Sequence, residues 1–217
     1  MRRYAILSGL LAAVYVALSV VVATGSLHRF DLSVSHAVAM LYRPGLLPLF
    51  RGLALLGGLE LTLLLAVGLF IYLWREGYRL GAFGAAVLPL ASLVETAYKH
   101  NIVQPGPPRS IAHPDGPSLT LLFEDPTGSG WSFPSGHMTR AVVVYGLLAF
   151  VIQRLGGPGR LRQWAVPLAI AVVLLEAFDR LYLEVHWESD VLGGILLGAT
   201  FLAAAIAWLE WSEARAE

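Results

Sequence analysis

A short polar run, Pro134, Ser135, Gly136 and His137, interrupts a strongly apolar sequence. Pro134 can preset the backbone before a helix, and Ser135 is a common N-cap residue type. We therefore expect a helix to begin here, with the N–H groups of Ser135, Gly136 and His137 free to face an anion, which the helix dipole favours. Gly136 would let the backbone approach that anion closely.

A second polar pair, His186 and Asp190, is spaced by four residues, which places both on one helical face if the turn there is helical. A carboxylate that accepts a hydrogen bond from Nδ1–H holds an imidazole in one tautomer and leaves Nε2 free to attack. His137 could then act as the general acid toward the leaving oxygen. These residues predict phosphoryl transfer through a phosphohistidine, with positioning and electrostatic stabilisation supplying most of the rate.

Basic residues suited to phosphate oxygens, Lys99 and Arg180, stand near the ends of apolar stretches. Charges at membrane depth are costly, so their gathering with two histidines indicates a functional site. Lys99 could instead extend from its helix to the membrane surface. Glu95 and Glu176 precede Lys99 and Arg180 by four residues, which predicts helix ion pairs. The spacing matches no zinc signature, and we expect neither a metal nor another cofactor.

The composition indicates a membrane protein. Of the 217 residues, 57% are hydrophobic and only 14% are charged, whereas soluble domains carry about 25% charged residues. The formal net charge is zero, so no basic surface suggests a nucleic-acid partner. The sequence has no cysteine, which excludes disulfides, thiolate zinc sites and cysteine nucleophiles.

Six apolar stretches are long enough to span a membrane, at about 20 residues each: 4–24, 52–74, 80–98, 138–154, 164–182 and 190–210. The first could be a cleaved signal peptide, but its apolar run exceeds the usual signal core, and we favour a retained helix. Residues 27–50 are typical of short interfacial helices, and 101–133 are polar and rich in Pro and Gly. We predict an all-α, single membrane-embedded domain over 1–217, with six transmembrane helices and a small extracytoplasmic cap.

The distribution of basic residues predicts the orientation. Six spans place both termini on one side, and the positive-inside rule makes that side the cytoplasm. Basic residues on this side include Arg2, Arg3, Arg75, Arg79, Arg154, Arg160 and Arg162. The opposite side also holds seven basic residues, and the bias appears only when Lys99, Arg109, Arg140 and Arg180, which stand in polar clusters that look functional, are left out of the count. The polar segments 99–137 and 179–190 would then face the periplasm or the exterior. We expect a multi-pass protein of the cell membrane, whose partners are the bilayer and a phosphorylated lipid; the sequence does not indicate an oligomeric state.

Two motifs resemble those of a known family. The PSGH run at 134–137 and the R-x5-H-x3-D pattern at 180–190 resemble two signatures of the type 2 phosphatidic acid phosphatase family, which also includes vanadium haloperoxidases. The resemblance covers the third to sixth spans and implies a membrane lipid phosphatase. It implies a nucleophile, its orienting partner and an acid in His186, Asp190 and His137, and phosphate binding by Lys99, Ser135, Gly136 and Arg180.

The sequence departs from the family pattern at two places. The first signature, K-x6-R-P, has Gly106 in place of its arginine, and Arg109 follows three positions later. Either Arg109 reaches the phosphate through a bulged loop, or Arg140, three residues after His137, takes over its role. The serine of the third signature is replaced by Asp179, which we expect to pair with Arg180 or a loop donor.

The sequence is compatible with several substrates and with more than one reaction. Among the family's lipids we favour undecaprenyl diphosphate, since its recycling is needed on the outer face; phosphatidic acid and phosphatidylglycerol phosphate are the alternatives. A phosphotransferase would pass the phosphate to another lipid or sugar. A non-catalytic lipid-binding or transport protein is the third reading, against which the presence of both histidines and Asp190 argues.

Overall fold

The computed structural model describes residues 1–108, 110–113 and 131–215, and within these residues it contains helices and no β-strand. Six helical stretches in this part of the chain are long and apolar enough to cross a membrane. They are Arg2–Ala23, Pro44–Arg75, Arg79–Asn101, Gly136–Leu155, Arg160–Tyr182 and Glu188–Glu213. The prediction of an all-α protein with six transmembrane helices is therefore confirmed.

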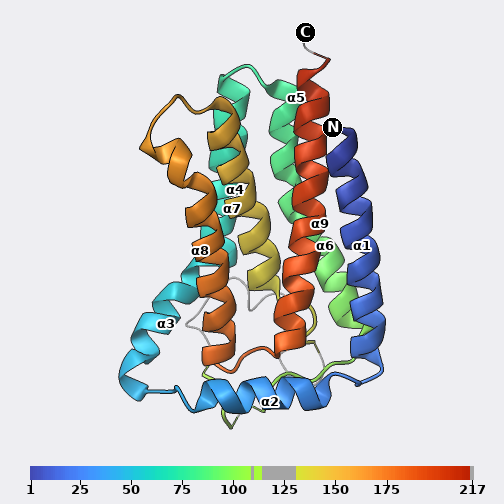
Figure 1. Ribbon diagram of the computed structural model, residues 1–217, viewed down its shortest axis with the longest axis vertical. Coiled ribbons are helices and arrows are strands. Elements are labelled where there is room, and N and C mark those ends of the chain that lie inside the picture. The colour runs from blue at the N-terminus through green and yellow to red at the C-terminus, as the bar shows by residue number, and fades with distance from the viewer. Residues whose placement is uncertain (109, 114–130, 216–217) are drawn as a thin grey trace.

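The centre of the bundle is α7 (Gly136–Leu155), which packs against α8 (Arg160–Tyr182), α9 (Glu188–Glu213), α6 (Val87–Asn101) and α4 (Leu59–Arg75). The α7 span is 56% buried, whereas only 11% of the α8 span is buried. The exposed leucine, isoleucine and valine side chains of α8 suit a lipid-facing surface. The outer helix α1 (Arg2–Ala23) lies along α9 (Figure 1).

Small residues let α9 approach α7 closely at the end that carries the polar motifs. A Cβ atom at Gly194 would lie 2.4 Å from the Ser135 carbonyl oxygen, and one at Gly198 would lie 2.8 Å from the Thr139 carbonyl oxygen. Such contacts are shorter than side chains tolerate, so glycine is required for this backbone approach. The beginning of α9 is thereby fixed against the beginning of α7.

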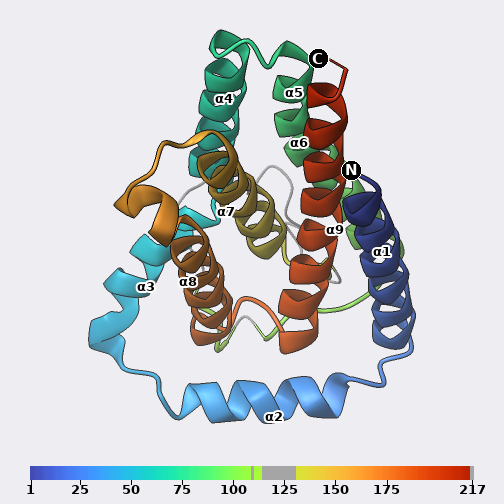
Figure 2. The ribbon, with the colours of Figure 1, turned by 45° about the horizontal axis from the view of Figure 1, so that its top comes forward.

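The short helix α2 (His28–Ala39) crosses one end of the bundle, opposite the end at which both termini lie (Figures 1 and 2). Its Asp31 is buried, and the two carboxylate oxygens accept hydrogen bonds from Ser189 N at 2.9 Å and Ser189 Oγ at 2.8 Å. Burial raises the pKa of Asp31, although these two hydrogen bonds act in the opposite direction. α2 is thus attached to the first turn of α9.

Short helical elements follow α2 and lead into α4. η1 (Pro44–Leu46) and α3 (Leu47–Leu53) are followed by η2 (Ala54–Leu56), which leads into α4. On the opposite side of the membrane region, α5 (Arg79–Ala82) and η3 (Phe83–Ala86) precede α6. Two side chains of α7 hold the η2 turn: Tyr145 donates to the Leu56 carbonyl at 2.8 Å, and Arg140 Nε donates to the Gly57 carbonyl at 3.0 Å.

Candidate active site

The ends of four helices bring the predicted site residues together near α2. Lys99 lies in the last turn of α6, His137 in the first turn of α7 and Arg180 in the last turn of α8. Asp190 lies in the first turn of α9, with His186 just before that helix. Glu95 of α6 contacts both Lys99 and Arg140, and the Ser135 N–H at the beginning of α7 donates to the Asp190 carbonyl, so these helix ends meet at one site. Arg109 lies outside the described residues.

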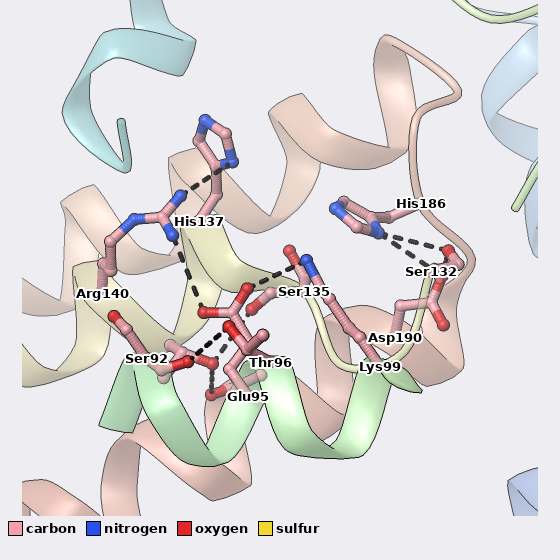
Figure 3. A network of polar contacts seen from close by, with 12 residues as sticks. Ser92, Glu95, Thr96, Lys99, Ser132, Ser135, His137, Arg140, His186 and Asp190 are labelled. Atoms are coloured by element: carbon pink, nitrogen blue, oxygen red, sulfur yellow. Dashed lines mark hydrogen bonds and ion pairs between the residues drawn. The ribbon is translucent and has the colours of Figure 1, made fainter. Parts of the chain in front are cut away.

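His186 and Asp190 form the pair that the sequence predicts. Their Nδ1 and Oδ2 atoms are 3.5 Å apart (Figure 3), and Asp190 is fully buried, whereas 13% of the His186 side chain is exposed. Because α9 begins at Glu188, a turn rather than a helical face brings the two side chains together. The Trp187 N–H donates to Asp190 Oδ2 at 2.9 Å, so Asp190 also caps its own helix.

Two further residues of this site were not predicted from the sequence. Ser132 Oγ donates to Asp190 Oδ2 and lies 3.4 Å from His186 Nδ1. Gln104 Nε2 donates to Asp190 Oδ1 at 3.0 Å and to Ser189 Oγ at 2.9 Å. Both lie in the polar segment 101–133, where the only available signal was polarity close to a motif. Together with Trp187 N–H they fix the carboxylate that orients His186.

Ser135 occupies the N-cap position of α7, as predicted, but its backbone is engaged differently from the expectation. Its N–H donates to the Asp190 carbonyl at 3.0 Å, so this group is not free to face an anion. Its hydroxyl is fully buried and has no hydrogen-bond partner among the described residues. Gly136 and His137 lie in the first turn of α7, whose N–H groups have no partner within a helix.

Arg140 lies beside His137, on the same face of α7. Its NH2 atom is 3.4 Å from His137 Nδ1, and its NH1 atom is 3.7 Å from Glu95 Oε2 (Figure 3). A guanidinium can only donate, so His137 Nδ1 is the acceptor. A neutral His137 then carries its proton on Nε2, and it becomes a general acid only when Nδ1 is protonated as well, which ends the contact with Arg140.

The other two cations of the site make the ion pairs that the sequence predicts. Lys99 Nζ lies 2.9 Å from Glu95 Oε1, one helical turn away. Arg180 Nε lies 3.5 Å from Glu176 Oε1 and 3.0 Å from Asp179 Oδ2. Asp179, which replaces the serine of the family pattern, is therefore a partner of Arg180. In residues 1–108, 110–113 and 131–215, no three His, Cys, Asp or Glu side chains gather as metal ligands.

This arrangement can perform phosphoryl transfer. It places an imidazole held by a carboxylate, a second imidazole at the beginning of α7, and basic side chains at the ends of adjacent helices. Such a set supplies a nucleophile, a general acid and positive charge for phosphate oxygens.

The family model described as the PAP2 superfamily matches residues 79–214. This range begins at α5 and ends just past α9, so it includes every residue of the site that the structure describes.

Two curated proteins resemble the chain over most of its length. Phosphatidylglycerophosphatase B of Bacillus subtilis is 28% identical, with 85% of each chain covered. Decaprenylphosphoryl-5-phosphoribose phosphatase of Mycobacterium tuberculosis is 30% identical, with 79% of this chain and 86% of the relative covered.

A crystal structure has the same fold. It is that of a transmembrane PAP2-type phosphatidylglycerolphosphate phosphatase from Bacillus subtilis, with a TM-score of 0.73 and 24% sequence identity. The similarity covers 94% of this chain and 96% of the other. The arrangement of helices described above is thus the arrangement of a known membrane protein.

Proposed function

Because this chain belongs to the PAP2 superfamily, we propose that it removes phosphate from a lipid at the outer face of the membrane through a phosphohistidine intermediate. The chain is a multi-pass membrane protein and a lipid phosphatase, and therefore a hydrolase. The observation that carries the proposed chemistry is the pairing of His186 Nδ1 with Asp190 Oδ2 at 3.5 Å. This pairing leaves His186 Nε2 as the nucleophilic nitrogen.

In the first step, His186 Nε2 attacks the phosphorus atom and a new P–N bond forms. The bond between phosphorus and the leaving oxygen breaks, and its electron pair stays on that oxygen. His137, in its imidazolium form, gives its Nε2 proton to the same oxygen and becomes neutral, so the lipid leaves with that oxygen protonated. Asp190 stabilises the positive charge that develops on the ring of His186.

In the second step, water attacks the phosphorus atom from the side that the lipid has left. His137, now a neutral imidazole without a proton on Nε2, takes one from the water, which restores its imidazolium form. The P–N bond breaks, and inorganic phosphate and free His186 are the products. Lys99, Arg180 and Arg140, with Ser135 Oγ, bind the phosphoryl oxygens in both steps; Arg109 stays a further candidate.

The orientation follows from the two ends of the bundle. The site lies at the end that α2 crosses, and both termini lie at the other end (Figure 1). Arg2, Arg3 and the basic turns belong to the end of the bundle that carries the termini. The positive-inside rule assigns that end to the cytoplasm, so we expect the site on the outer side of the membrane. We propose one membrane-embedded phosphatase domain, with its termini in the cytoplasm and its site in the periplasm or exterior.

Phosphatidylglycerol phosphate is the substrate that the comparisons favour, because the relative named for it covers 85% of both chains. A polyprenyl lipid is the second candidate, since the mycobacterial relative is named for a decaprenyl compound. Undecaprenyl diphosphate, which the sequence reading favours, belongs to this second class.

A panel of lipids tests this function. Purified protein in detergent micelles is expected to release inorganic phosphate from phosphatidylglycerol phosphate faster than from undecaprenyl diphosphate or phosphatidic acid, and the His186→Ala variant should be inactive on all three. Phosphate release is read by a colorimetric assay and lipid products by mass spectrometry. Equal release by the His186→Ala variant would refute the mechanism, and a product that forms only with an added acceptor would indicate a phosphotransferase.

The contribution of Arg140 gives a separate prediction. Replacing Arg140 with alanine should lower kcat/KM for phosphate release by about 10²-fold, which is typical for the loss of one group that stabilises developing negative charge. The side chain is 4% exposed and lies 3.4 Å from His137 Nδ1, so the loss should also disturb the acid. Steady-state kinetics of both variants check this, with Arg154→Ala, at the opposite end of the bundle, as the control; full activity of Arg140→Ala would contradict it.

A further inference from the structure

Glu95 places a negative charge inside the group of cations that the proposed function assigns to the phosphate. Its side chain is buried, at 4% exposure, and projects from α6 one turn before Lys99. Oε1 lies 2.9 Å from Lys99 Nζ, and Oε2 lies 3.7 Å from Arg140 NH1 (Figure 3). One carboxylate therefore binds two of the cations, and these come from two different helices.

The same carboxylate lies against the first residue of α7. A Cβ atom built on Gly136 would lie 2.2 Å from Glu95 Oε1 and 2.8 Å from Arg140 NH1. Gly136 begins α7, and the beginning of a helix favours an anion. The Glu95 carboxylate is thus held at the helix end that is expected to receive the phosphoryl group, and by two of the same basic side chains.

We propose that Glu95 is an internal competitor of phosphate. In the substrate-free protein it holds Lys99 and Arg140 in place, and a bound phosphoryl group draws these cations away from it. This inference rests on the proposed function, because it requires the phosphoryl group to bind among these residues.

The competition weakens the retention of the product. A phosphate ion and a carboxylate at this depth repel each other, and this repulsion is larger than in water because the surroundings are less polarisable. The substrate has its lipid part as an additional source of binding, whereas inorganic phosphate has only its charge. Glu95 therefore favours the exchange of product for new substrate, and it keeps buried cations paired between turnovers.

Charge removal at Glu95 tests the proposal. In Glu95→Gln, the inhibition constant for inorganic phosphate and for orthovanadate should fall by about tenfold or more, since one nearby negative charge is lost. Glu95→Met should show the same change, so the expectation does not depend on one variant folding. Inhibition is measured from lipid phosphate release, and orthovanadate binding is measured independently from the rise in melting temperature.

A matched control has the same change of charge far from the site. Glu213 pairs with Arg154 at 2.9 Å near the end of α9, and Glu213→Gln should leave both inhibition constants unchanged. Unchanged or higher constants in both Glu95 variants would overturn the proposal, as would the failure of both to fold, which would make Glu95 purely structural. If wild-type protein releases no phosphate from any lipid, the proposed function fails, and orthovanadate binding still decides the role of Glu95.

Discussion

Replacement of His186 with alanine should reduce lipid phosphate release by about 10³-fold or more while the protein keeps its fold. The loss follows because His186 supplies the nucleophilic nitrogen of the proposed mechanism. The fold should persist because Asp190 keeps hydrogen bonds from Trp187 N, Gln104 Nε2 and Ser132 Oγ. His186 itself precedes α9 and belongs to none of the hydrophobic core clusters of the bundle.

Rapid-quench experiments with a radiolabelled lipid phosphate check this result at the level of the intermediate. Wild-type protein should accumulate an acid-labile phosphoprotein, and His186→Ala should not. His100→Ala is the matched control, because His100 is exposed beside Lys99 and its Nδ1 atom contacts the Thr96 carbonyl at 2.8 Å. A labelled His186→Ala protein would show that another residue carries the phosphate.

Replacement of Arg180 with alanine should cost both activity and stability. Arg180 is 1% exposed, and its ion pairs with Glu176 and Asp179 involve two carboxylates that are fully buried. Loss of one partner of a buried ion pair typically destabilises a protein by about 3–5 kcal/mol, because charges remain buried with less compensation. Phosphate release should fall as well, since a cation of the phosphate site is removed.

The exposed ion pair at the other end of the bundle provides the comparison. Arg154 NH2 lies 2.9 Å from Glu213 Oε2, and 58% of the Arg154 side chain is exposed. Arg154→Ala should change stability by about 0–1 kcal/mol. Thermal unfolding in detergent measures both variants, and Arg180→Lys separates charge from geometry, since a lysine keeps the charge but not the planar fork. Equal melting temperatures for the two alanine variants would contradict the expectation.

The membrane fold could be predicted from the sequence because length and apolarity set the requirement for a span. The six spans depend on patterns that are local in the sequence. The attachment of α2 was not predictable in this way. It depends on hydrogen bonds between Asp31 and Ser189, residues far apart in the sequence that only the folded bundle brings together.

The candidate site likewise contains residues that the sequence predicted and residues that it did not. His137, His186 and Asp190 stand in motifs whose spacing alone indicates their chemistry. Ser132 and Gln104 contact Asp190 from a loop of irregular sequence, so no periodicity marked them.

Two contacts between helices, made by the backbone of Ser135 and the carboxylate of Glu95, were also not predicted from the sequence. The sequence predicted a free N–H at Ser135, but the approach of α9 provides the Asp190 carbonyl as its acceptor. For Glu95 the sequence predicted the pair with Lys99 and not the contact with Arg140 from another helix.

The packing of α1 along α9 has a consequence for the biosynthesis of the protein. The main neighbour of α1 is α9, which is synthesised much later, so α1 must wait in the bilayer until α9 has been made. His186 and Asp190 arrive with that same segment. A nascent chain that ends before α9 therefore lacks both the partner of α1 and the proposed nucleophile.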